Sequence, residues 1–86
     1  MLMAKEKPQT IKIAVDAPFS NIYTVQLGKA IRKDFYIDCG IEGDFTDCGG
    51  VSELLILFLA TDEVAENILN YIAKRWEFIA GPELLS

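Results

Sequence analysis

The chain has 86 residues, of which 51% are apolar, and a net charge of −5. This size gives room for one domain with one core, and the apolar share argues against disorder. The acidic balance disfavours nucleic-acid partners, no apolar run approaches the ~20 residues of a membrane span, and the lack of histidine excludes Ser-His-Asp and Cys-His catalysis within the chain.

Residues 1–9 contain charges and a proline with no apolar stretch behind them. They do not resemble a secretory signal, and we expect a flexible arm in a cytoplasmic protein. A single α+β domain is expected over residues 10–86.

The first predicted strand covers 10–16, where every second residue is a large apolar one: Ile11, Ile13 and Val15. Pro18 ends it, and Ser20 is the expected N-cap of a helix near 20–33. Gly28 lies inside that helix at a cost of ~1 kcal/mol relative to alanine, which suggests a close approach to the sheet.

A second strand is expected over 35–42, again from alternating apolar residues: Phe35, Ile37, Cys39 and Ile41. A two-residue turn at Gly43 and Asp44 would place Cys39 opposite Cys48. A longer loop through Gly50 would separate them. We interpret the cysteines as small apolar groups, with a redox pair as the alternative.

Residues 54–60 form a run of seven apolar residues, and the length and upstream glycines favour a strand buried on both faces. A sheet with helices on one side needs apolar residues only at alternate positions. One of two sets is therefore in excess: Leu55, Leu57 and Leu59, or Leu54, Ile56 and Phe58.

The last predicted helix covers 62–79, with Thr61 as its N-cap and the Gly81-Pro82 pair as its stop. The competing interpretation ends it near Arg75 and makes 76–80 a short fourth strand. The element order predicts a small ferredoxin-like sandwich, βαββα(β), with a three- or four-stranded sheet and two helices on one face.

Charged residues gather in three places, at the end of the first helix (Lys29, Arg32, Lys33), at the start of the last (Asp62, Glu63, Glu66) and around the turn (Asp38, Glu42, Asp44, Asp47). The first two groups are expected to compensate the helix dipoles and each other. The third does not match the calcium-loop spacing. We therefore predict no metal site, no cofactor and no catalytic residue.

The excess of apolar residues in 54–60 carries the functional hypothesis. We expect a non-catalytic protein–protein interaction module, a small regulatory, adaptor or inhibitor protein that self-associates or docks on a larger protein. The predicted contact residues are the apolar Leu55, Leu57 and Leu59 and the acidic Asp38, Glu42, Asp44 and Asp47. The alternative is a small-ligand-sensing regulatory domain with its pocket at a dimer interface.

Overall fold

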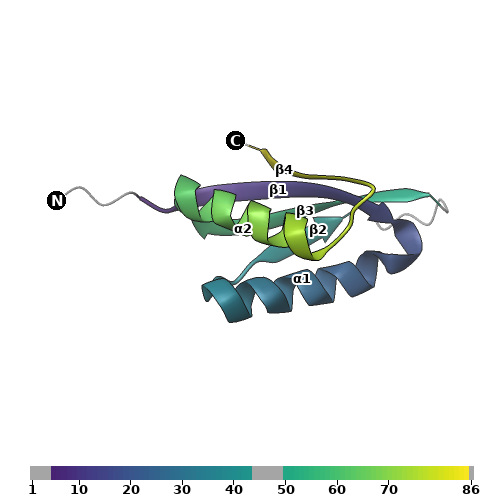
Figure 1. The fold of residues 1–86 in the computed structure, drawn as a ribbon, viewed down its shortest axis with the longest axis horizontal. Coiled ribbons are helices and arrows are strands. Elements are labelled where there is room, and N and C mark those ends of the chain that lie inside the picture. Colours follow the sequence, from purple (N-terminus) through teal and green to yellow (C-terminus); the bar gives the residue numbers. More distant parts are fainter. Residues whose placement is uncertain (1–4, 44–49, 86) are drawn as a thin grey trace.

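The fold was obtained as a computed structural model, which describes residues 5–43 and 50–85 (Figure 1). Its elements, in chain order, are β1 (Lys7–Asp16), the short 3-10 helix η1 (Ala17–Phe19), α1 (Ser20–Phe35), β2 (Gly40–Gly43), β3 (Val51–Ala60), α2 (Asp62–Arg75) and β4 (Ala80–Leu85). The four strands form one antiparallel sheet in the order β2-β3-β1-β4. This is the predicted ferredoxin-like arrangement, with four strands.

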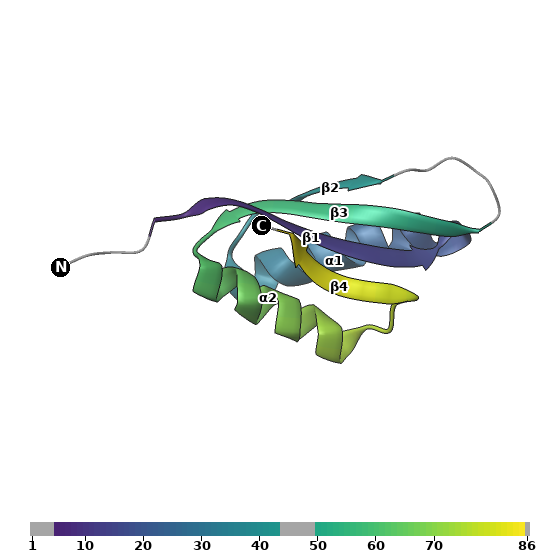
Figure 2. The same cartoon turned by 90° about the horizontal axis from the view of Figure 1, so that it is seen from above.

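The core lies between the sheet and the two helices, which cover the same side of it (Figures 1 and 2). Its fully buried residues come alternately from β1 and β3 and at helical spacing from α1 and α2: Ile11, Ile13, Val15, Leu54, Ile56, Leu27, Ile31, Ala65, Ile68 and Ile72. The alternation in β1 is thus confirmed. The strand itself begins at Lys7, three residues before the expected start.

α1 begins without a side-chain cap. Ser20 is the first helical residue rather than the N-cap, and its hydroxyl donates to the carbonyl oxygen of Ala17. A Cβ added at Gly28 would meet nothing within 4 Å, so the expected close approach at this glycine is wrong. The helix ends at Phe35, where Tyr36 adopts a left-handed conformation.

α2 is capped as predicted, with the Thr61 hydroxyl accepting from the Val64 amide. Its predicted end at residue 79 is wrong, because the backbone becomes extended at Trp76. Two aromatic residues that follow α2 contact α1 instead. The Trp76 indole donates to Gln26 at 3.3 Å, and the Phe78 ring lies 5.7 Å from that of Tyr23.

The fourth strand is Ala80–Leu85, not 76–80, so Gly81 and Pro82 lie inside a strand rather than ending a helix. β4 pairs with β1 across an irregularity between Lys12 and Ala14. Gly81 has φ +87, and a Cβ there would lie 2.7 Å from the carbonyl oxygen of Lys12. Only glycine fits this position.

The second strand is shorter than predicted, since only Gly40–Gly43 forms β2. It pairs Gly40 with Leu57 and Gly43 with Leu54. A two-residue turn would instead pair Gly40 with Asp47, so the prediction of that turn is wrong. The predicted register that placed Cys39 opposite Cys48 depended on the same turn and is wrong too. Cys48 lies outside the described residues.

Candidate functional site

The sheet has one face that neither helix covers, and we name it the open face. Because side chains alternate along a strand, the burial of Leu54, Ile56 and Phe58 against the helices turns Leu55, Leu57 and Leu59 to the open face. Leu55 and Leu57 are half-buried, and Leu59 is 59% exposed. The structure therefore decides which apolar set is in excess, and corrects the expectation that both faces of this strand are buried.

A row of charges crosses the open face at the level of Leu55. Strand pairing aligns Glu42 of β2, Leu55 of β3, Lys12 of β1 and Glu83 of β4. The Lys12 ammonium lies 3.9 Å from Glu83 and 3.7 Å from Glu53, which is two residues from Leu55 on the same face of β3. Two carboxylates thus share one ammonium. Glu42 adds a third carboxylate on the other side of Leu55, which leaves this face with an acidic balance.

The half of the open face beyond this row is apolar. Leu57, Thr10 and Leu85 lie side by side on neighbouring strands, and Leu59 pairs with Pro8. We call these five residues the apolar half. Leu85 belongs to it because the C-terminal segment extends the sheet as β4 rather than folding over the face, while Leu84 turns to the core.

The predicted acidic contacts divide between two places. Glu42 lies on the open face, opposite Leu55. Asp38 lies just before β2, is exposed, and pairs with Arg32 at 3.1 Å. Asp44 and Asp47 are outside the described residues. The structure therefore joins Glu42 to the leucines and places Asp38 at the margin.

A groove of about 570 Å3 continues the apolar half at the margin where Asp38 lies. One wall is the end of β3 and the other is the segment that leads to β2; its lining residues are Leu57, Phe58, Leu59, Tyr36, Ile37, Asp38, Glu6 and Pro8. Tyr36 was not among the predicted site residues, because it lies between the alternating apolar residues Phe35 and Ile37 of the strand predicted over 35–42. Its left-handed backbone, with φ 56, ends α1, and its amide donates to the carbonyl oxygen of Arg32.

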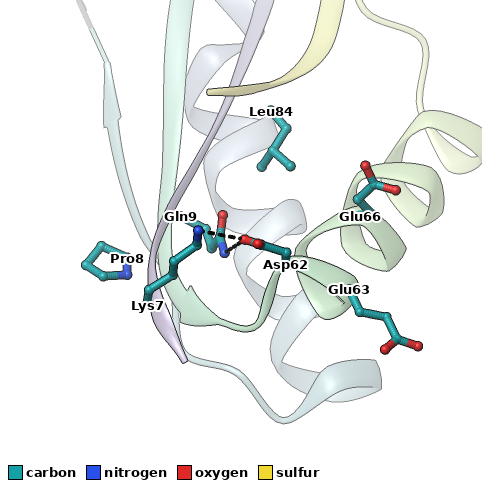
Figure 3. A pocket seen from close by; sticks show the side chains of 7 residues that line it. All are labelled: Lys7, Pro8, Gln9, Asp62, Glu63, Glu66 and Leu84. Carbon is teal, nitrogen blue, oxygen red and sulfur yellow. Dashed lines mark hydrogen bonds and ion pairs between the residues drawn. The ribbon is translucent and has the colours of Figure 1, made fainter. Parts of the chain in front are cut away.

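A second groove, of about 670 Å3, lies between the start of β1 and the start of α2 (Figure 3). Both Lys7 and Gln9 point to Asp62, with distances of 3.1 Å from the ammonium and from the amide nitrogen (Figure 3). The donated hydrogen bond from Gln9, followed by that from Lys7, lowers the pKa of the Asp62 carboxyl. These contacts tie β1 to α2.

Gln9 has a structural role in this groove. Its side chain is only 4% exposed, and its amide nitrogen also donates to the carbonyl oxygen of Ala60 at 3.0 Å. The expectation of a flexible arm over residues 1–9 did not foresee this role, because residues 7–9 belong to β1. The end of α1 and the start of α2 do lie at the same end of the sheet, as expected (Figure 1). However, Arg32 pairs with Asp38 and Asp62 with Lys7, so the two helix ends do not pair with each other.

Three further features of the described residues concern a thiol, metal binding and membrane spans. Cys39 is half-buried, and desolvation, with a smaller contribution from Asp38, raises the pKa of its thiol. Residues 5–43 and 50–85 contain no group of three or more metal-binding side chains. No helix among these residues is long and apolar enough to cross a membrane.

Comparisons with protein-family models, with curated proteins and with solved structures find no match to this chain. The fold defines the chain as an α+β protein of ferredoxin-like topology. This fold hosts many unrelated functions, so function has to be argued from the open face and its margin.

Proposed function

We propose that the protein is a non-catalytic interaction module that docks on a partner protein through the open face. The observation that carries the proposal is the position of Leu55, Leu57 and Leu59 on the face that neither helix covers. The core uses the other set of this strand, and these three leucines are not among the described residues that form the core or pack against it. Apolar residues grouped in this way typically mark interaction surfaces.

The apolar half supplies the affinity in this proposal. Leucine side chains that go from exposed to fully buried contribute about 1.5–3 kcal/mol each. Leu59 has most to gain, because it is the most exposed of the three. Covering it together with Leu57 and Leu85 would offset part of the cost of bringing two proteins together.

The charged row favours a partner with a basic surface over a second copy of the chain. Two copies packed face to face would bring Glu42, Glu53 and Glu83 of each together, and Lys12 is the one cation in this row of described residues. A basic surface would instead be attracted to this acidic balance. Self-association is therefore the weaker form of the proposal. The cytoplasmic location and the lack of nucleic-acid partners stay predictions from the sequence.

The test compares the protein with two variants by affinity capture from native lysate and by the mass of the purified protein at low micromolar concentration. The wild type and a control, Ile22→Lys on α1, should retain the same partner. Leu55→Glu combined with Leu57→Lys should lose it while remaining folded. Ile22 is a matched control because it is an apolar residue 52% exposed on another surface. Capture that the paired substitution leaves intact, or a monomeric protein with no partner, would count against the proposal.

A further inference from the structure

The margin of the open face has an unpaired strand edge. β2 pairs with β3 only over Leu54–Leu57, whereas β3 continues to Ala60. On its other side the end of β3 is fully paired, since Phe58 pairs with Gln9 and Ala60 with Lys7. Within the described residues no strand covers the β2 side of Phe58–Ala60.

The segment next to this edge, residues 36–39, does not pair with it in the described structure. Residues 36–39 lead from α1 to β2 without strand structure, and their one backbone hydrogen bond within the described residues runs from Tyr36 back to Arg32. The groove of about 570 Å3 occupies the space between Tyr36–Asp38 and the end of β3. Edges left open in this way are templates for an added strand.

The backbone and the exposure of Tyr36 also indicate a contact at this groove. Its backbone is left-handed, with φ 56 and ψ 35, a position at a helix end where glycine is usual. Its ring is 90% exposed, so the side chain contributes almost no burial to the fold. Folding alone therefore favours glycine at this position, and an exposed aromatic ring beside a groove favours a contact made outside the chain.

Charge indicates what the added strand carries. Glu6 and Asp38 line the groove, and within the described residues Glu6 forms no ion pair. On the far side of Tyr36, Lys29 and Lys33 line a separate hollow. A basic residue is therefore favoured at the Glu6 end of the groove and opposed at the Lys29 end, while Leu57 and Leu59 receive apolar side chains.

We propose that this groove binds an extended segment of the partner, with alternating apolar side chains and a basic residue at one end, which adds as a strand to the edge of β3 at Phe58–Ala60. The proposal rests on the proposed function and specifies how the partner is held. Strand addition supplies affinity through main-chain hydrogen bonds and selectivity through alternate side chains.

The test is a fluorescence-anisotropy titration of the full chain with short labelled peptides of alternating valine and threonine. The probe carries an arginine at one end and is made in both orientations. One matched peptide has glutamate in place of arginine, and another is N-methylated at alternate backbone nitrogens, which blocks strand pairing without changing the side chains. Each change should weaken binding about tenfold, the ratio that corresponds to ~1.4 kcal/mol.

The protein variants locate the binding. Leu59→Lys and Tyr36→Gly should each weaken the arginine peptide about tenfold, whereas Ile22→Lys should leave it unchanged. The proposal is overturned if no peptide binds at about millimolar concentration, if N-methylation has no effect, or if both groove variants bind normally. Leu55→Glu separates the two proposals, because Leu55 is on the open face but does not line the groove. If it abolishes partner capture while the peptides fail to bind, docking stands and strand addition does not.

Discussion

Leu54 and Leu55 are chain neighbours on one strand, yet the first is fully buried and the second lies on the open face. The same holds along β3, where Ile56 and Phe58 meet the helices while Leu57 and Leu59 do not. Two sets of similar residues thus have different tasks, one in the core and the other outside it. The comparison shows that hydrophobicity predicts burial only once the position of the helices is known.

The largest effect should come from exchanging the two sets for charges. Leu54→Glu with Ile56→Lys places two charges in the core, where unpaired burial costs several kcal/mol each, and a domain of this size has only ~5–10 kcal/mol of stability. We expect an unfolded chain by circular dichroism. Leu55→Glu with Leu57→Lys should give a cooperative thermal transition close to that of the wild type. If both pairs unfold the protein, the open face is part of the core.

The next effect concerns β4, in which the C-terminal segment extends the sheet and does not fold over the open face. Gly81→Ala forces a side chain into a left-handed position and 2.7 Å from the Lys12 carbonyl oxygen. We expect a loss of about 1–3 kcal/mol in the free energy of unfolding, measured by urea denaturation. Gly28→Ala is the matched substitution, because its Cβ meets nothing, and it should stabilise α1 by ~1 kcal/mol. Equal effects of the two would mean that β4 does not hold this geometry.

Tyr36→Gly should separate stability from binding. Relief of the left-handed conformation favours the variant by about 1–2 kcal/mol, and the greater freedom of glycine in the unfolded chain offsets ~0.5–1 kcal/mol of this. We expect a thermal midpoint equal to or slightly above that of the wild type. A clear fall in the midpoint would show that the Tyr36 ring serves the fold, and the argument for its external contact would fail.

The smallest effect is on thiol chemistry. The raised pKa of Cys39 leaves less thiolate at a given pH than in a free thiol, so alkylation should be slower at pH 8. Measurement by iodoacetamide labelling and mass spectrometry uses the Cys48→Ser variant, which isolates Cys39. Cys39→Ala should cost some stability and leave partner capture intact. Labelling as fast as that of a small free thiol would contradict the interpretation of Cys39 as a small apolar group.

Local patterns were sufficient where one face of an element is apolar and the other is not. β1 was predicted from the alternation of Ile11, Ile13 and Val15, and α2 from its stripe and the Thr61 cap. Local patterns were not sufficient where the same residues fit both a helix and an extended segment. Trp76 continues the helical spacing of Ile68 and Ile72. However, contacts of Trp76 with Gln26 and of Phe78 with Tyr23, about fifty residues earlier in the chain, hold this segment extended.

The sequence by itself therefore determined the order of the first three strands and the two helices and the presence of an excess apolar set in 54–60. Tertiary structure alone decided which set faces outward, because Leu54 and Leu55 are chemically identical and only the side on which the helices pack distinguishes them. It also decided that Ala80–Leu85 is a strand, since the bonds that stabilise a strand come from its neighbour, here the free edge of β1. The groove beside Tyr36 has the same origin, because β2 begins at Gly40, opposite Leu57, and among the described residues leaves the last residues of β3 unpaired on that side.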